Sequence, residues 1–346
     1  MIMIGAFYMK KNMSLWADNL FINNKKKSLP ILSFPGIQLM NKNVNELVND
    51  GNLQANCMKI IADRYENMLA SVSLMDLSVE AEAFGSQIRY EKNEVPTVVG
   101  SIVNNLEDAK GLKVPEVGEK RTKECINAIK YATNLIKDRP IFAGVIGPFS
   151  LAGRLMDMTE IMIKCYVDPE TVKIVLEKVT DFIIEYIKAL KQSGANGVII
   201  AEPAAGLLSP ELMAEFSNLY IKKIKLATEE DDFLLIYHNC GNINQLIDEI
   251  LKLDFRIIHV GNNANIENLL EKVPQNILLM GNISPAEYFK DENVEKIINK
   301  TKEMLEKYDK YNNYYISSGC DIPPTSSLKN IDAYFDVISQ FYDKKY

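Results

Sequence analysis

Three residues have the types and spacing of a metal site: His238, Cys240 and Cys320. Imidazole nitrogen and thiolate sulfur are ligands that Zn²⁺ takes in proteins, at roughly 2.0–2.3 Å. His238 and Cys240 stand two positions apart, so on an extended strand end their side chains point to the same side. Three protein ligands leave a fourth position open, which is typical of a catalytic zinc site. The alternative is that the thiols are small buried core groups and His238 is a hydrogen-bonded polar residue.

His259 is the only other histidine in the chain. As a fourth ligand it would close the site and make the zinc structural. A closed site of two cysteines and two histidines has no room for a substrate. We therefore interpret His259 as a group that hydrogen-bonds to the reacting groups beside the metal.

These residues must be positioned by the elements around them. Short apolar runs rich in β-branched and aromatic residues alternate with longer segments of helical periodicity, such as 172–190 and a helix that starts at Ser209-Pro210. This alternation indicates parallel strands joined by right-handed crossovers. We predict eight strands, at 30–34, 72–79, 141–146, 197–201, 233–237, 256–260, 277–280 and 314–318.

Two α/β architectures fit eight such strands: a doubly wound open sheet and a (β/α)₈ TIM barrel. The first strand is followed by Phe34-Pro-Gly-Ile-Gln38, which is not a dinucleotide loop, and no P-loop is present. The strand count favours the barrel. We predict one barrel domain over 30–346, with an N-terminal helical extension at 1–29 and an added segment at 91–120.

Barrel enzymes build their sites from residues at the C-terminal strand ends. Both histidines, two of the five cysteines and Glu202, after the fourth predicted strand, fall at such ends. Asp76 lies within an apolar segment, so we predict that it points into the barrel and orients the site. The alternative for Asp76, Glu80 and Glu82 is a solvated loop.

Composition excludes several classes of protein. The 346 residues carry a net charge of −7, which argues against a nucleic-acid partner. No apolar run approaches the roughly 20 residues that span a bilayer, and the apolar N-terminus is too short for a signal peptide. The five scattered cysteines do not form a disulfide framework; Cys57, Cys125 and Cys165 fall in helical patterns and are expected in the core. We expect a cytoplasmic protein.

Several motifs resemble the uroporphyrinogen decarboxylase superfamily: Gly147-Pro-Phe-Ser-Leu-Ala152, 201–210, Gly281-Asn-Ile-Ser-Pro285 and 317–324. The His-x-Cys pair in Tyr237-His-Asn-Cys-Gly241, with Cys320, more narrowly resembles its methyltransferase branch, the methylcobamide:coenzyme M methyltransferases. The resemblance runs from about Pro30 to the C-terminus.

The resemblance implies a (β/α)₈ barrel, one Zn²⁺, a thiol substrate and a methylated corrinoid (methylcobamide) carried by a partner protein. His238, Cys240 and Cys320 match the zinc ligands of that branch. Glu202 stands where the family carries an acidic residue, which makes it a candidate fourth ligand or proton acceptor. The methyl acceptor stays open: coenzyme M, another thiol or tetrahydrofolate.

Two other functions deserve comparison. A uroporphyrinogen decarboxylase binds a substrate with eight carboxylates, which calls for clustered arginines; residues 31–40 carry no basic residue. A corrinoid-binding module would show Asp-x-His-x-x-Gly, and isoleucine stands at the Asp position before both His238 and His259. We therefore expect the corrinoid to be held by a partner.

Overall fold

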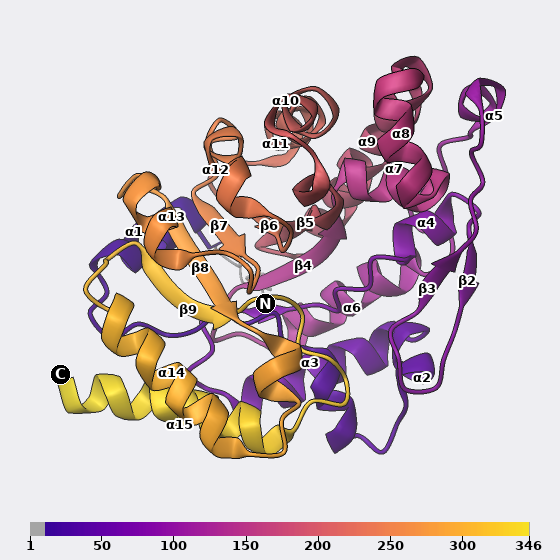
Figure 1. Cartoon of the computed structure of the whole chain (residues 1–346). Helices are drawn as coiled ribbons and strands as arrows, with labels where there is room; N and C mark the ends of the chain where they lie inside the picture. Colours follow the sequence, from indigo (N-terminus) through magenta and orange to yellow (C-terminus); the bar gives the residue numbers. More distant parts are fainter. Residues whose placement is uncertain (1–10, 346) are drawn as a thin grey trace, which may run out of the picture.

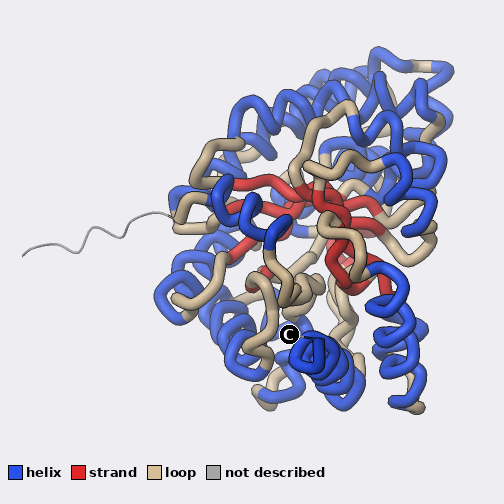
Figure 2. Tube along the Cα trace, turned by 90° about the vertical axis from the view of Figure 1, so that its left-hand side faces the viewer, coloured by secondary structure: helices blue, strands red, loops and turns tan. Residues whose placement is uncertain are grey.

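The computed structural model describes residues 11–345. Seven parallel strands form one curled sheet in the order β1-β4-β5-β6-β7-β8-β9. Helices surround the sheet, which lies in the middle of the molecule (Figures 1 and 2). The strands are β1 Ser71–Val72, β4 Ile141–Ile146, β5 Gly197–Ala201, β6 Leu234–Asn239, β7 Ile257–Val260, β8 Leu278–Ile283 and β9 Tyr314–Ser318. The expected TIM-barrel-like fold is confirmed, with seven paired strands in place of eight.

Most helices lie between successive strands, as the crossover rule requires. Those before β4 are α1 Met13–Ile22, η1 Phe34–Leu39, α2 Val44–Val48, α3 Gly51–Arg64, α4 Val79–Ala83, α5 Leu106–Gly111 and α6 Thr122–Leu135. Between β4 and β6 lie α7 Pro148–Met156, α8 Met158–Val167, α9 Pro169–Gln192, η2 Pro203–Leu207, α10 Pro210–Met213, η3 Ala214–Asn218 and α11 Leu219–Thr228. The rest are α12 Ile243–Leu251, α13 Ile266–Lys272, η4 Pro285–Phe289, α14 Val294–Tyr308 and α15 Leu328–Lys345.

The predicted first strand, 30–34, is wrong. This buried segment passes between β9 and β1 without joining the sheet ladder. Serine hydroxyls take the place of strand pairing: Ser317 Oγ donates to the Leu29 carbonyl at 2.6 Å, and the Ile31 N–H donates to Ser318 Oγ at 3.1 Å. Pro30 has no N–H to offer a ladder, so these side-chain bonds join the segment to β9. On the side of β1, the Leu69 N–H donates to the Ser28 carbonyl at 2.7 Å.

The second predicted strand, 72–79, is much shorter than expected, because the sheet ends at Val72. Asp76 Oδ1 accepts from the Ser78 N–H at 3.0 Å and the Ser78 hydroxyl at 2.6 Å. An aspartate that bonds the backbone two residues on forms a turn in place of a strand. The chain then enters α4. The added segment 91–120 contributes β3 Thr97–Val99, which pairs antiparallel with β2 Gln87–Arg89 outside the barrel.

A separate apolar cluster fills the barrel. Inward side chains from every strand of the large sheet meet Met13, Ala17 and Leu20 of α1. Helix α1 therefore packs against the inward-facing side chains of the barrel, and it is tied to the segment before β6 by Met13 and Ser14, whose N–H groups donate to the Asp231 carbonyl. The described part of the predicted extension 1–29 contains one helix, α1, and its first ten residues lie outside the described residues.

Within residues 11–345, no helix is long and apolar enough to cross a membrane.

Candidate metal centre

Strand alternation directs the site residues inward. Ile236 and Ile257 point into the barrel, so His238 and His259, two positions further along β6 and β7, point the same way. The two histidines are register partners across these strands. Cys240 follows the end of β6, and Cys320 follows the end of β9.

The three predicted ligands converge. The ligand atoms of His238, Cys240 and Cys320 all lie within 4.8 Å of one another. Tetrahedral zinc ligands at the usual bond lengths lie roughly 3.3–3.8 Å apart, so movements of about 1 Å would complete the set. Among the described residues, this is the group of His, Cys, Asp and Glu side chains close enough to hold a metal.

A chain of hydrogen bonds fixes the tautomer of both histidines. The Ser317 hydroxyl donates its proton to the Leu29 carbonyl. Its oxygen therefore accepts a hydrogen bond from His259 Nε2, 2.8 Å away. Burial lowers the pKa of His259 well below its usual value, so the ring is neutral and its Nδ1 carries a lone pair. That atom accepts from Nδ1–H of His238 at 2.9 Å.

The last link leaves Nε2 of His238 with a lone pair and no proton. This atom is buried and makes no hydrogen bond with any described residue. A buried acceptor without a partner is costly unless something else binds it. Metal-ligating histidines usually donate their other N–H to an oriented acceptor, as His238 does to His259. The donor set and the orphaned nitrogen both fit a zinc ion.

The two thiols of the site interact, and their pKa values shift in opposite directions. The pKa of Cys240 is lowered because Cys320 hydrogen-bonds to it, and the same bond together with burial raises the pKa of Cys320. One sulfur is thus prepared to be a thiolate before any cation binds. Burial alone raises the pKa of Cys57 to about 12, as expected for a core thiol in α3. All five cysteines are free.

Glu202 is fully buried beside the site, after β5. Its carboxylate accepts from the backbone N–H groups of Phe149 at 3.1 Å and Ser150 at 2.6 Å, and from the Ser150 hydroxyl at 2.5 Å. These donors belong to the first turn of α7, where a negative charge is favoured. Burial nevertheless raises the pKa of Glu202 to about 7. Gly147 has to be glycine, because a Cβ there would lie 2.3 Å from the carboxylate.

Asp76 is buried in the loop after β1, and its partner is Arg121 at the start of α6. Arg121 also bonds Glu82 Oε2 at 2.6 Å and Ser78 Oγ at 2.8 Å. Its positive charge is therefore balanced by carboxylates of the protein itself. The solvated-loop alternative for Asp76 is thereby wrong. The carboxylate of Asp76 forms an ion pair with Arg121, and its role in orienting the site stays a prediction.

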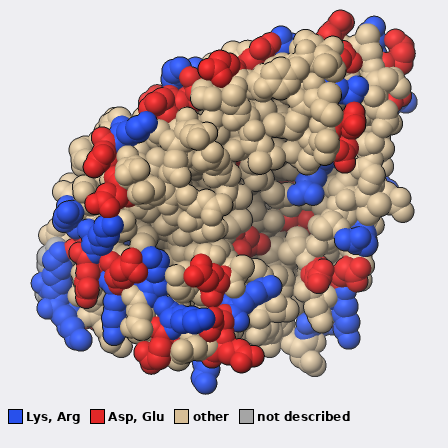
Figure 3. Space-filling view, viewed as in Figure 1, with Lys and Arg blue, Asp and Glu red and all other residues tan. Residues whose placement is uncertain are grey.

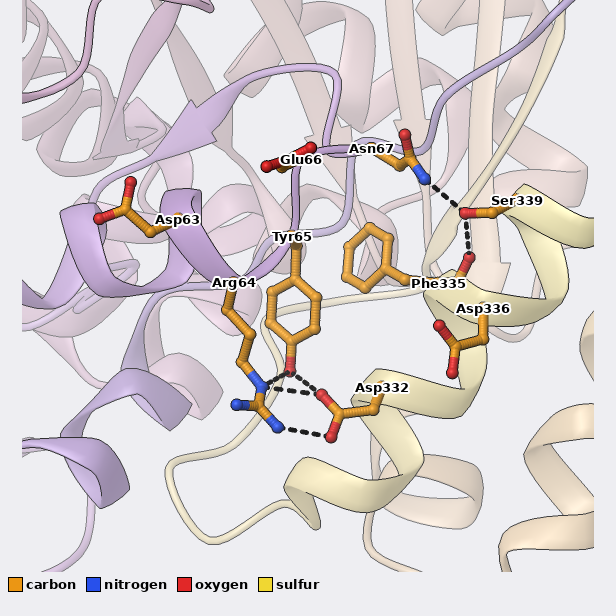
Figure 4. A pocket seen from close by; sticks show the side chains of 9 residues that line it. All are labelled: Asp63, Arg64, Tyr65, Glu66, Asn67, Asp332, Phe335, Asp336 and Ser339. Atoms are coloured by element: carbon orange, nitrogen blue, oxygen red, sulfur yellow. Dashed lines mark hydrogen bonds and ion pairs between the residues drawn. The ribbon is translucent and has the colours of Figure 1, made fainter.

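A cavity of about 500 Å³ lies elsewhere, between the end of α3 and α15 (Figure 4). Its arginine, Arg64, forms a two-point pair with Asp332, at 2.6 and 2.8 Å, and Tyr65 donates to the same carboxylate at 2.9 Å. The cavity contains none of the candidate site residues. We assign these contacts with Asp332 a structural role, because they hold α15 to the end of α3.

Sequence reasoning missed Ser317 and Arg121. Ser317 lies two positions after the inward-facing Tyr315, so strand alternation alone would have placed it inside the barrel. No local pattern predicts the role of Arg121, because its partner Asp76 lies 45 positions away in the chain.

The fold and the cysteine–histidine centre together indicate the family of this protein. The model of the family described as "Uroporphyrinogen decarboxylase (URO-D)" matches residues 37–341, and the chain belongs to this family. Its relatives include the methylcobamide:CoM methyltransferases MtbA of Methanosarcina acetivorans and MtaA of Methanosarcina barkeri. The first is 29% identical over 235 residues, covering 67% of this chain and 69% of the relative. The second is 26% identical over 271 residues, covering 77% and 78%.

A uroporphyrinogen decarboxylase of Francisella philomiragia is 22% identical over 287 residues, covering 81% of this chain and 82% of that one. The resemblance to the superfamily and its methyltransferase branch is thus confirmed.

Solved structures show the same fold. A methyltransferase from Methanosarcina mazei aligns with a TM-score of 0.83 at 23% identity, over 96% of this chain and 98% of that one. A B12-independent methionine synthase from Shewanella aligns less closely, with a TM-score of 0.57 at 14% identity, over 84% and 87%.

Proposed function

We propose that this protein is a zinc-dependent methyltransferase that moves a methyl group from a methylated corrinoid, carried by a partner protein, to a thiol such as coenzyme M. The observation that carries the proposal is the group of His238, Cys240 and Cys320 at the C-terminal strand ends, with a buried lone pair on Nε2 of His238. The relatives named for this chemistry support it.

His238, Cys240 and Cys320 would hold the zinc ion and leave one position for the acceptor. When bound, the ion would lower the pKa of the acceptor thiol. A free thiol has a pKa near 8.5, whereas a coordinated thiol is deprotonated. The thiolates of Cys240 and Cys320 would offset the charge of such an ion, so that the acceptor sulfur would keep its electron density. That sulfur forms a bond to the methyl carbon, and the electron pair of the cobalt–carbon bond stays with the corrinoid.

The remaining residues of the chain position these groups. His259 and Ser317 hold His238 in the tautomer that points Nε2 at the ligand thiols. Glu202 lies outside the close group of ligand atoms, and we propose it as the acceptor of the thiol proton. Asp76 orients the loop after β1 through its pair with Arg121.

We propose that the corrinoid comes from a partner protein. A corrin held by this chain through histidine would need a free imidazole nitrogen directed at cobalt. His259 uses both nitrogens inside the barrel, and the one free nitrogen of His238 faces the cysteines. The five cysteines, none of them paired, are in keeping with the expected cytoplasmic location.

Decarboxylation of uroporphyrinogen is the other function in the family. It would require several basic groups free to bind carboxylates. Five of the six arginines are paired with carboxylates of the protein: Arg64, Arg89, Arg121, Arg139 and Arg256. This pairing disfavours the decarboxylase.

The test is a methyl-transfer assay with the zinc-loaded protein, methylcobalamin and a panel of thiols. We expect the optical spectrum of reduced cobalamin to appear together with the methylated thiol, and Cys165→Ala to behave as wild type. Absence of transfer to any thiol or to tetrahydrofolate, with release of carbon dioxide from uroporphyrinogen, would establish the decarboxylase instead.

A further inference from the structure

The loops around the metal ligands share a surface without exposed charge. They are the connections that follow β5, β6, β7 and β9, at 202–209, 240–242, 261–265 and 319–327. Glu202 is buried and Asp321 is half-buried, so every exposed residue of these loops is uncharged. The exposed residues are Leu207, Asn242, Asn262, Asn263, Asn265 and Thr325. Asparagine dominates this surface, and we call its four asparagines the amide rim.

The opposite end of the same strands has an ordinary charged surface. The segments that lead into β6, β7 and β9 expose Glu230, Asp231, Lys252, Asp254 and Lys310. Figure 3 shows a hollow near the centre of one face, and the broad surface above it is largely uncharged, whereas charged side chains gather along the upper edge and over the lower part. Since the centres of protein interfaces are depleted of charged residues, the uncharged end that holds the metal centre has the character of a docking surface.

The amide rim packs against the segments of both ligand cysteines. A Cβ on Gly261 would lie 2.4 Å from Cys240 Cα, and a Cβ on Gly319 would lie 2.7 Å from the backbone nitrogen of Asn262. Glycine at both positions lets the backbones approach this closely. Because Cys320 follows Gly319, Asn262 lies next to the ligand ends of both β6 and β9. A molecule that contacts the amide rim is therefore brought to the metal centre.

Two further asparagines hold the amide rim in place. Asn282 Nδ2 donates to the Gly261 carbonyl at 3.0 Å. Asn244 donates to the Asn263 carbonyl at 3.1 Å and accepts from the Asn265 N–H at 2.8 Å. The loop after β7 is thus fixed before any ligand arrives, which lowers the entropy cost of binding to it.

The amide groups suit a ligand that both donates and accepts hydrogen bonds. Asn262 Nδ2 donates to Asn263 Oδ1 at 3.1 Å. Within the described residues, this bond leaves Asn262 Oδ1 as an acceptor and Asn263 Nδ2 as a donor. A carboxylate only accepts and an ammonium only donates, whereas a primary carboxamide does both. Leu207, which is 63% exposed, lies beside Asn242, whose N–H donates to the Gly206 carbonyl at 3.1 Å.

We propose that the amide rim binds the edge of the corrin ring carried by the partner, by pairing with the carboxamide side chains of the ring. This inference rests on the proposed function. The periphery of a cobamide carries neutral primary carboxamides and methyl groups. The asparagines pair with the carboxamides, and Leu207 contacts the methyl groups. Docking of this kind needs no ion pairs, so it depends little on salt.

The test measures the binding of cyanocobalamin, which donates no methyl group, to zinc-loaded protein by equilibrium dialysis. Asn263→Asp keeps the shape of the side chain but removes its donor, and it should weaken binding by about 10-fold. The KM for methylcobalamin should rise by the same factor, with kcat and zinc content unchanged. Asn263→Gln, which restores an amide, should recover part of the loss. Wild type should bind cyanocobalamin more tightly than a derivative whose peripheral carboxamides are hydrolysed to carboxylates.

The matched control is Asn276→Asp, which makes the same change at an exposed position before β8, at the other end of the strands. It should bind as wild type does. Binding to wild type should change less than about 2-fold between about 0.05 and 0.5 M salt.

Three results would each overturn the inference: full binding by Asn263→Asp, a steep fall of wild-type binding with salt, or no binding by wild type at roughly 1 mM cobalamin. If Asn263→Asp loses cobalamin binding while wild type transfers no methyl group to any thiol, the proposed function fails and the cobamide surface stands. If methyl transfer proceeds with the same KM in both proteins, the proposed function stands and the amide rim has no part in it.

Discussion

The Nδ1 atoms of His238 and His259 lie 2.9 Å apart inside the barrel, and only one of them can carry a proton in that contact. Ser317 decides which, because it leaves His259 Nε2 as a donor and His259 Nδ1 as an acceptor. The ligand nitrogen is thereby set by a serine on another strand.

His259→Ala should keep the zinc but slow methyl transfer by about 10- to 100-fold, as expected when the group that orients a metal-bound histidine is lost. Ser317→Ala removes only the hydrogen bond between Ser317 and His259, so it should slow methyl transfer less. Metal content and turnover measured on the same samples separate the two. Complete loss of zinc from His259→Ala would mean that His259 is itself a ligand.

Cys240→Ala and Cys320→Ala should each lose the metal while staying folded, because both side chains lie at strand ends outside the apolar cluster that fills the barrel. Elemental analysis should give about one zinc per chain for wild type and for the control Cys165→Ala, whose thiol lies in α8. Wild type that is fully active without metal would contradict the proposed chemistry.

Asp76→Asn should reduce turnover, and it should also lower the free energy of unfolding by about 1.5–3 kcal/mol, since a buried partner of Arg121 loses its charge. Glu82→Gln weakens the same arginine from its more exposed side and is the matched control. Denaturant unfolding and turnover below the unfolding temperature distinguish stability from positioning. Equal turnover in both variants would restrict Asp76 to a structural role.

Glu80 makes the stability of the protein depend on pH in a way that does not involve the metal ligands. Burial raises its pKa from 4.5 to about 7. The native state therefore binds a proton between these values that the unfolded chain releases. Its contribution to stability is fully present below pH 4.5 and is lost as the pH rises to about 7, on the order of 3 kcal/mol in all.

Glu80→Gln should flatten that part of the stability profile, because glutamine is neutral and its carbonyl can still accept from the Ile146 N–H. Denaturant unfolding at a series of pH values is the measurement. A profile of equal slope in the variant would show that Glu80 is not the titrating group.

Periodicity within one strand could be predicted from the sequence, and relations between strands could not. The two-residue spacing of His238 and Cys240 correctly indicated that both point inward. The contact between His238 and His259 depends on the register of β6 with β7, which no local pattern encodes. The alternation of elements predicts the barrel correctly. The apolar composition of 30–34 wrongly predicts a strand, because it is the same as that of the strands around it.

The charged residues show the same limit. The apolar neighbours of Asp76 predict a strand at this position, whereas Asp76 lies in a turn formed with Ser78 and pairs with Arg121. The apolar neighbours of Asp76 predicted its burial correctly. They carried no information about a partner on α6, which tertiary packing supplies.

The most direct test of the central claim is X-ray absorption at the zinc edge, with and without an acceptor thiol. The account predicts two sulfur ligands and one imidazole from the protein, and a third sulfur when 2-mercaptoethanesulfonate is added. A zinc with two sulfur and two imidazole ligands that does not change on addition of thiol would contradict it, since His259 would then close the site.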